Sequence, residues 1–162
     1  MFSDICHSVA RQLITHGHSV SVAESSTGGL IAANLLSVAG ASNYFRGGSV
    51  IYTRESRYAF LDLDLAKLKG LKPLTEPMVA EFADAARLKL GATWGIAELG
   101  AAGPKGTPYG HAPGTSVIGI SGPVNATVTL QTSSDSREDN MARFAEAALS
   151  LFNETLRKFD QT

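Results

Sequence analysis

The residues with the greatest chemical potential form one short segment, Ala23 to Gly29, with the sequence A-E-S-S-T-G-G. This segment brings hydroxyl groups, a carboxylate and two glycines together between an apolar stretch, Ser19 to Ala23, and a helical pattern that begins at Leu30. The start of a helix leaves backbone N–H groups unpaired and carries a partial positive charge. Glycine lets the main chain come close to a ligand. Such a turn can bind a phosphate group or stabilise an oxyanion.

The same composition is also typical of an ordinary capped turn between a strand and a helix, with Ser26 or Thr27 as the N-cap. For Glu24, a hydrogen bond to a neighbouring donor that holds the loop is favoured over direct chemistry. Tyr52 fits sheet packing and a pocket wall equally well, and Asn34 is interpreted as a satisfied buried amide. The other motifs of the chain must therefore decide between the two interpretations of the turn.

Hydrophobic periodicity predicts the elements that position this turn. In the first part of the chain we expect a helix over 2–17, a strand over 19–23, a helix over 30–38, a loop over 39–46, a strand over 47–53 and a helix over 54–61. Gly17 is expected to end the first helix. The segment Leu63 to Leu74 is rich in lysine and is expected to be irregular, with Lys67, Lys69 and Lys72 on a solvated face or, alternatively, against an anionic ligand.

In the second part of the chain, helices and strands continue to alternate until two consecutive strands form a hairpin. A helix is expected to open at Thr75, the N-cap, with Pro77 in the first turn, and a strand over 94–99 lacks polar residues, which indicates that both of its faces are covered. A loop rich in Gly and Pro over 100–113, an antiparallel hairpin over 115–132 and a long amphipathic helix over 137–159 follow. This order predicts an α/β fold, a three-layer α/β/α sandwich with a mixed parallel and antiparallel sheet in one domain, 1–162. Ligands of such sheets bind at the carboxyl ends of the strands.

Composition excludes several classes of protein. The 162 residues carry a net charge of −1 and no cluster of lysine and arginine, so the electrostatic footprint of a nucleic-acid-binding protein is absent. Cys6 is the only cysteine, which rules out an intrachain disulfide, and the four histidines lack metal-ligand spacing, so no metal and no cofactor are expected. Apolar runs end well before the roughly 20 residues of a membrane span. We expect a cytoplasmic protein without a targeting segment, with no nucleic-acid or membrane partner.

Four motifs occur in a fixed order along the chain: A-E-S-S-T-G-G, then G-A-S-N-Y-F-R-G-G-S-V-I-Y over 40–52, T-E-P over 75–77, and A-G-P-x-G over 102–106. By these motifs the chain resembles the C-terminal domain of the competence/damage-inducible CinA family, whose active members are nicotinamide-nucleotide amidohydrolases. The resemblance covers nearly the whole sequence. It implies hydrolysis of the carboxamide of nicotinamide mononucleotide to nicotinic acid mononucleotide and ammonia, without a metal and often from a homodimer.

The resemblance makes Ser25 the nucleophile, and it also identifies three departures from the family pattern. Active relatives have a lysine where this chain has Arg57, and an arginine cannot take the proton of a serine because it stays charged. Leu99 stands where relatives have a serine or threonine before G-x-A-G-P. Met141 replaces an arginine in the first turns of the last helix, which removes a candidate contact to an anion.

Two residues are candidates to compensate for the missing base. Lys105 lies in the loop expected to border the site, and burial can turn a lysine into a base. Glu98 is an unusual charge in an apolar strand, and it is interpreted as a base or as an ion-pair partner of Arg57. The predicted catalytic residues are therefore Ser25, Arg57, Lys105 and Glu98.

The predicted pocket consists of the turn 24–29, the segment 48–57 and the loop 100–106. Its expected substrate-binding residues are Glu24, Ser26, Thr27, Gly28, Gly29, Gly48, Tyr52, Ala102, Gly103, Pro104 and Gly106, with the backbone N–H groups of 27–29 as donors to an oxyanion or a phosphate. The sequence thus predicts an amidohydrolase of nicotinamide mononucleotide or a related amide, acting as a homodimer on a small nucleotide. The alternative is a catalytically silent paralogue that binds a nucleotide or a protein partner through the same pocket, and a purely structural, oligomer-forming domain is the third hypothesis.

Overall fold

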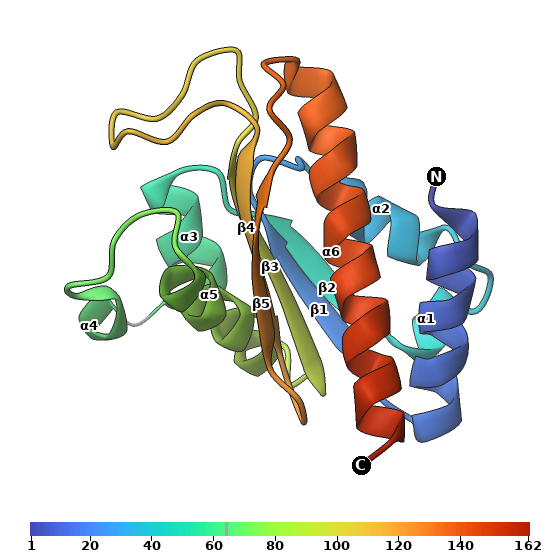
Figure 1. The fold of residues 1–162 in the computed structure, drawn as a ribbon. Coiled ribbons are helices and arrows are strands. Elements are labelled where there is room, and N and C mark those ends of the chain that lie inside the picture. Colours follow the sequence, from blue (N-terminus) through green and yellow to red (C-terminus); the bar gives the residue numbers. More distant parts are fainter. Residues whose placement is uncertain (64) are drawn as a thin grey trace.

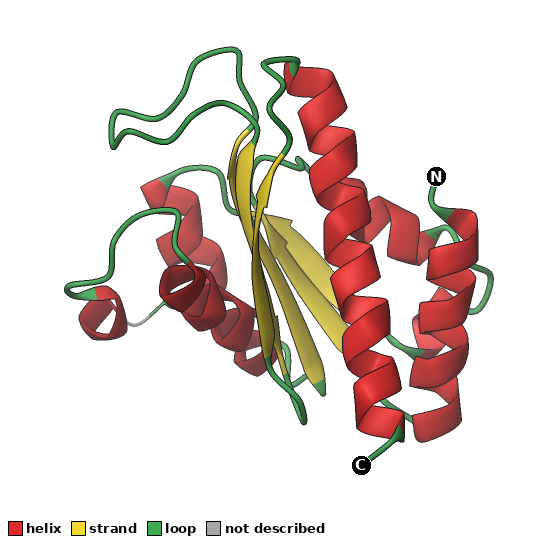
Figure 2. Ribbon diagram, in the orientation of Figure 1, coloured by secondary structure: helices red, strands yellow, loops and turns green. Residues whose placement is uncertain are grey.

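The fold is that of a three-layer α/β/α sandwich, as the sequence predicts. The structure is a computed structural model that describes residues 1–63 and 65–162. Five strands form one sheet in the order β2-β1-β3-β4-β5, with helices on both of its faces (Figure 1). Figure 2 shows the strands as a single layer between the two groups of helices.

The sheet combines parallel and antiparallel pairing. β1 (Val20–Glu24) lies between the parallel strands β2 (Phe45–Val50) and β3 (Trp94–Ala101), and β4 (Thr115–Ser121) and β5 (Ala126–Gln131) continue the sheet as an antiparallel hairpin. Every residue of β1 and β4 is buried. The carboxyl ends of β1, β2 and β3 therefore meet at one edge, where the predicted site motifs are located.

The helices divide between the two faces of the sheet. One face carries α1 (Ser3–His16), α2 (Leu30–Leu36) and α6 (Arg137–Asp160), and the other carries α3 (Arg54–Leu61), α4 (Leu65–Leu68) and α5 (Glu76–Lys89) (Figure 1). Each face has its own hydrophobic cluster, one built around Ile96 and Phe152 and the other around Phe82 and Leu99. In the described part of the chain, no helix combines the length and the apolar character needed to cross a bilayer.

The boundaries differ from the predicted ones mainly around β2. This strand covers 45–50 and not 47–53, because Phe45 pairs with Val20 of β1 and Gly48 packs closely under α2, where an added Cβ would lie 3.1 Å from the Cβ of Ala32. A short 3-10 helix, Ala41–Asn43, interrupts the predicted loop, and α4 occupies part of the segment predicted to be irregular. The part of that prediction that concerns residue 64 lies outside the described residues. Gly17 ends α1 with a φ of 64°, as expected.

An aromatic cluster joins the end of α6 to α1 and β3. The indole N–H of Trp94 donates to Nδ1 of His18 at 3.1 Å, and Phe159 packs against both rings. Burial lowers the pKa of His18, and the charge of His16 lowers it further, whereas Asp160 acts in the opposite direction. The hydrogen bond itself needs the neutral imidazole, because a protonated Nδ1 has no lone pair to accept with.

We expect the stabilisation from His18 to be present above about pH 6.5 and to be lost as the pH falls, because the unfolded chain takes up the proton before the folded protein does. Trp94 is the only tryptophan, so its single indole N–H resonance can be followed by NMR during an acid titration. It should shift with a midpoint below 6.5. The shift should vanish in His18→Gln and persist in the control His7→Gln, and a midpoint above 6.5 would contradict the assignment.

Candidate active site

The A-E-S-S-T-G-G segment forms the turn from β1 to α2 at the carboxyl edge of the sheet. Glu24 is the last residue of β1, and α2 begins at Leu30 after Gly28 and Gly29, which both have a positive φ. The four residues from Glu24 to Thr27 are buried, and Ser25 is only 6% exposed. We refer to residues 24–29 as the serine turn.

The carboxylate of Glu24 caps α2 from the end of the preceding strand. It accepts hydrogen bonds from N–H of Gly29 at 2.7 Å, Ile31 at 3.1 Å and Ala32 at 2.9 Å, and from the hydroxyl of Thr27 at 2.8 Å. The N-cap position is Gly29, without a side-chain cap, so the prediction of Ser26 or Thr27 as the N-cap is wrong. The preference for Glu24 as a residue that holds the loop is confirmed.

Glu98 holds the other half of the serine turn. In the β1–β3 ladder it lies directly opposite Glu24, and it is fully buried. Its Oε2 accepts from N–H of Ser25 at 3.1 Å and from both N–H and Oγ1 of Thr27 at 3.0 Å, and its Oε1 accepts from Ser26 Oγ and, at 3.4 Å, from Ser116 Oγ. Burial raises the pKa of the Glu98 carboxyl because the charged form loses its hydration, while these hydrogen bonds act in the opposite direction.

The N–H groups that were expected to bind a ligand already have acceptors within the protein. N–H of Thr27 donates to Glu98, N–H of Gly29 donates to Glu24, and N–H of Gly28 donates to the carbonyl of Ser25 at 3.2 Å. The expectation that 27–29 supply donors to an oxyanion or a phosphate is therefore wrong. The sequence shows the donors correctly, but the tertiary structure brings a second buried carboxylate to them.

Ser25 is the exception among the hydroxyl groups of the serine turn. Ser26 and Thr27 both donate to carboxylates, whereas Ser25 Oγ makes no hydrogen bond within residues 1–63 and 65–162. In the same part of the chain, Gln12 Oε1 is the only buried side-chain oxygen or nitrogen atom without a partner, so Ser25 Oγ retains contact with solvent. The N–H of Ser26 also has no acceptor among the described residues.

Arg57 does not reach Glu98. Its Nε donates to the carbonyl of Ile51 at 3.3 Å, and its guanidinium lies 5.3 Å from the centre of the Phe82 ring. The ion pairs found among the described residues do not include the predicted Arg57–Glu98 pair. The sheet separates the two groups. Glu98 is two residues after Ile96 on β3, so both side chains lie on the face covered by α2 and α6, while Phe82 and Arg57 lie on the face covered by α3 and α5.

The loop after β3 is held by residues at the start of α6. The carbonyl of Gly103 accepts from Arg137 Nη1 at 2.8 Å, and the carbonyl of Ala102 accepts from Asn140 Nδ2 at 2.8 Å. Gly106 is packed against the backbone of His111, so an added Cβ would clash there. Pro104 and Lys105 are exposed, and the described residues provide Lys105 with no hydrogen bond or ion pair, so the contacts do not support its predicted role as a buried base.

Of the departures from the family pattern, Met141 lies against the serine turn and Leu99 lies on the other face of the sheet. Met141 packs against the serine turn, where its methyl carbon lies 3.3 Å from the position that a Cβ on Gly28 would occupy. Leu99 is buried in the cluster under α5 and leaves no hydroxyl at its position. Tyr52 is 57% exposed, and its hydroxyl accepts from Arg137 Nη2 at 3.2 Å, so its side chain is not buried in the sheet, and its role as a pocket wall stays a prediction.

Arg137 and Asn140 are the site residues that the sequence analysis missed. Asn140 is fully buried and also donates to the carbonyl of Ser134 at 2.8 Å, which fixes the segment before α6. A signal was present, since two polar residues spaced three apart begin a helix whose later positions are regularly apolar. The spacing alone could not show that both side chains point to the loop after β3.

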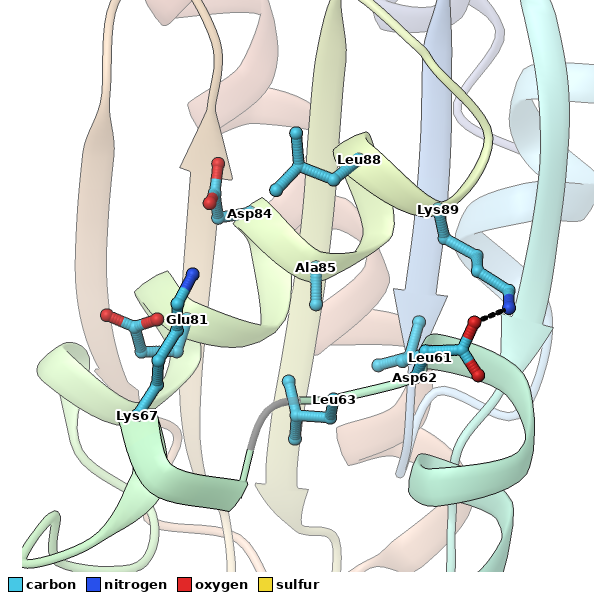
Figure 3. A pocket seen from close by; sticks show the side chains of 9 residues that line it. All are labelled: Leu61, Asp62, Leu63, Lys67, Glu81, Asp84, Ala85, Leu88 and Lys89. Carbon is cyan, nitrogen blue, oxygen red and sulfur yellow. Dashed lines mark hydrogen bonds and ion pairs between the residues drawn. The ribbon is translucent and has the colours of Figure 1, made fainter.

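Two hollows lie outside the serine turn. Figure 3 shows one of about 370 Å³ that is lined by Leu61, Asp62, Leu63, Lys67, Glu81, Asp84, Ala85, Leu88 and Lys89. Lys89 and Asp62 form an ion pair within it. A second, of about 760 Å³, is lined by Ala112, Pro113, Gln131, Ser133, Ser134 and Asp135. Neither includes a residue of the serine turn.

The burial of Glu98 predicts a pH effect on stability. Because its pKa is raised in the folded protein, the contribution of this carboxyl is fully present below about pH 4.5 and falls as the pH rises through the folded-state pKa. The difference in unfolding free energy between the wild type and Glu98→Gln, measured by urea denaturation from pH 4.5 to 8, should therefore decrease with pH.

Glu76 provides a control for this measurement. Hydrogen bonds from Thr127 and Thr129 lower the pKa of Glu76 from 4.5, so its contribution to stability changes only below that pH. The difference in unfolding free energy between the wild type and Glu76→Gln should therefore stay constant from pH 4.5 to 8. If the difference in unfolding free energy between the wild type and Glu98→Gln rises with pH, the hydrogen bonds to Glu98 outweigh burial in setting its pKa.

Comparison with known proteins identifies the family to which the chain belongs. The sequence profile of a family described as the CinA C-terminal domain matches residues 3–156. A CinA-like protein from Chlorobium limicola is 34% identical over 146 residues, covering 87% of this chain and 34% of the relative. One from Desulfosudis oleivorans is 38% identical over 151 residues, covering 93% of this chain and 36% of the relative. The chain thus spans about a third of the length of these curated relatives.

Solved structures show the same fold. A crystal structure of a CinA superfamily protein from Klebsiella pneumoniae matches with a TM-score of 0.88 at 26% identity, covering 98% of this chain and 99% of that one. The competence/damage-inducible protein CihA from Agrobacterium tumefaciens matches with a TM-score of 0.75 at 25% identity, covering 98% of this chain and 94% of that one. Together with the profile match over nearly all residues, these similarities show that the chain belongs to the CinA C-terminal domain family.

Proposed function

We propose that this chain hydrolyses the carboxamide of nicotinamide mononucleotide or a related amide, with Ser25 as the nucleophile. The observation that carries the proposal is the contrast within the serine turn. Ser26 and Thr27 donate to carboxylates, whereas Ser25 Oγ makes no hydrogen bond to any described residue and retains contact with solvent. The Ser25 hydroxyl is therefore the one hydroxyl of the turn that no internal acceptor engages, but the described residues also place no base on it of the kind that activates a serine nucleophile.

The backbone next to Ser25 supports the same chemistry. Ser25 Oγ attacks the carboxamide carbon, the C–N bond breaks, and ammonia leaves after the serine proton has passed to the departing nitrogen. Water then hydrolyses the ester and releases nicotinic acid mononucleotide. The N–H of Ser26, which has no acceptor in the described part of the chain, is a candidate donor to the oxyanion, since the residue after the nucleophile supplies this donor in other serine hydrolases.

The step with the least support from this site is removal of the proton from the Ser25 hydroxyl. Arg57 keeps its charge and is directed at Ile51 and Phe82, so it cannot accept the proton of Ser25. Positioned general bases contribute about 10²- to 10⁴-fold to rates. We therefore expect slow turnover by the wild type.

The second candidate function is binding without hydrolysis, of a nucleotide or a protein partner at the same turn. Two observations favour it. Arg57 stands where active relatives have a lysine, and the methyl group of Met141 packs against Gly28. In this case, the serine turn would serve recognition only.

One assay separates the two functions. We expect the purified chain to release ammonia slowly from nicotinamide mononucleotide, Ser25→Ala to release none, and Arg57→Lys to release it at least about 10-fold faster, because a lysine can take up the serine proton. Ammonia is measured with a coupled assay, and nicotinic acid mononucleotide by chromatography.

Arg54→Lys is the matched control, because it makes the same exchange at an exposed position of the same helix. Its rate should equal that of the wild type. Release by Arg57→Lys alone would identify a silenced site and favour the second function. Release that persists in Ser25→Ala would refute Ser25 as the nucleophile.

A further inference from the structure

The hollow shown in Figure 3 is formed by the end of α3, by α4 and by α5, on the face of the sheet opposite α6. We refer to it as the α4–α5 hollow. Its volume of about 370 Å³ lies within the range of roughly 300–1,000 Å³ that is usual for small-molecule sites. It contains no residue of the serine turn, so a molecule bound here is separate from the substrate of the proposed reaction.

The floor of the α4–α5 hollow is apolar. Leu61 and Leu63 are buried members of the hydrophobic cluster around Phe82, and Ala85 packs against the same cluster. Leu88 also lines the hollow, and 57% of its surface is exposed to solvent. Because removal of apolar surface from water is favourable, an aliphatic group that covers Leu88 and this floor would be bound by the hydrophobic effect.

Five charged residues line the hollow, and the protein itself compensates three of them. Lys89 forms an ion pair with Asp62, as Figure 3 shows. Asp84 Oδ1 accepts from Arg87 Nη2 at 2.8 Å, which gives this carboxylate a cationic partner outside the lining. The two lining charges that remain are Lys67 and Glu81.

Lys67 and Glu81 keep their charges available to a ligand. Lys67 belongs to α4 and Glu81, which is half-buried, to α5. The described residues provide neither side chain with a hydrogen bond or an ion pair, and the two do not pair with each other. Burial raises the pKa of Asp84, but its hydrogen bonds and the charges of Arg87 and Lys67 lower it below its usual value, so the ammonium of Lys67 acts on the groups inside the hollow.

We propose that the α4–α5 hollow binds a free amino acid with an aliphatic side chain. Its side chain lies on the apolar floor, its α-carboxylate at Lys67 and its α-ammonium at Glu81. This ligand carries both opposite charges on one carbon atom, beside an apolar chain, which is the complement of what the hollow presents.

Singly charged ligands fit the hollow less well. An aliphatic acid would compensate Lys67 but bring a second carboxylate to Glu81, and an aliphatic amine would bring a second ammonium to Lys67. Like charges that approach each other in a partly desolvated site raise the free energy of the complex. Only the zwitterion compensates both residues at once.

Calorimetric titration with L-leucine tests the proposal. We expect L-leucine to bind to the wild type. Isocaproate, which is leucine without its ammonium group, and isoamylamine, which is leucine without its carboxylate, should each bind at least about 10-fold more weakly, because one charge of the hollow stays uncompensated. Glycine should also bind at least about 10-fold more weakly, because it leaves the apolar floor uncovered.

Two variants assign the charges to their partners. Lys67→Met should weaken L-leucine binding at least about 10-fold and abolish the preference for leucine over isoamylamine, because the carboxylate has lost its partner. Glu81→Gln should have the same effect on the preference over isocaproate. Lys69→Met and Glu55→Gln are the matched controls, because both residues are exposed and lie outside the lining, and they should bind as the wild type does. Thermal unfolding checks that each variant is folded.

Three results would overturn the proposal: no binding of L-leucine by the wild type, equal binding of L-leucine and either singly charged analogue, or unchanged binding by both Lys67→Met and Glu81→Gln. Ser25→Ala should bind L-leucine as the wild type does, because Ser25 lies outside the hollow. Leucine binding without ammonia release would therefore leave this proposal intact and count against the hydrolase alone.

Discussion

The structure depends on how two facing, buried carboxylates are satisfied. Glu24 and Glu98 lie opposite each other in adjacent strands, and between them they are contacted by eight hydrogen-bond donor groups, most of them from the turn that follows β1. A buried carboxyl group without such donors would cost several kcal/mol. The donors of a helix start and the acceptors of two strands thus satisfy one another, and the serine turn is held in one conformation as a result.

This internal pairing changes what the turn can do. A glycine-rich strand-to-helix turn would ordinarily attract a phosphate, but its N–H groups here already have acceptors. Among the described residues, the hydroxyl of Ser25 and the N–H of Ser26 are the hydrogen-bond donors of the turn that have no acceptor.

The sheet separates two side chains that the sequence places in one pocket. From the sequence, Glu98 and Arg57 are predicted to form an ion pair. Because side chains alternate along β3, Glu98 lies on the face covered by α2 and α6. Arg57 belongs to α3 and lies on the face covered by α5, where its guanidinium packs over the ring of Phe82. The strand between them prevents the contact, so Arg57 is left without a carboxylate partner among the described residues.

The sequence by itself determined the layers, the mixed character of the sheet with its antiparallel hairpin, and nearly all helices, because these follow from hydrophobic period and from glycine and proline positions along the chain. It also located the serine turn, and it favoured a loop-holding role for Glu24. The partners of the turn were decided only by the tertiary structure. Glu98 is 71 residues from Thr27, Arg137 is 34 from Gly103 and Asn140 is 38 from Ala102, and strand register and helix placement bring these partners together. A local pattern shows which groups need a partner, but only the packed fold determines which partner arrives.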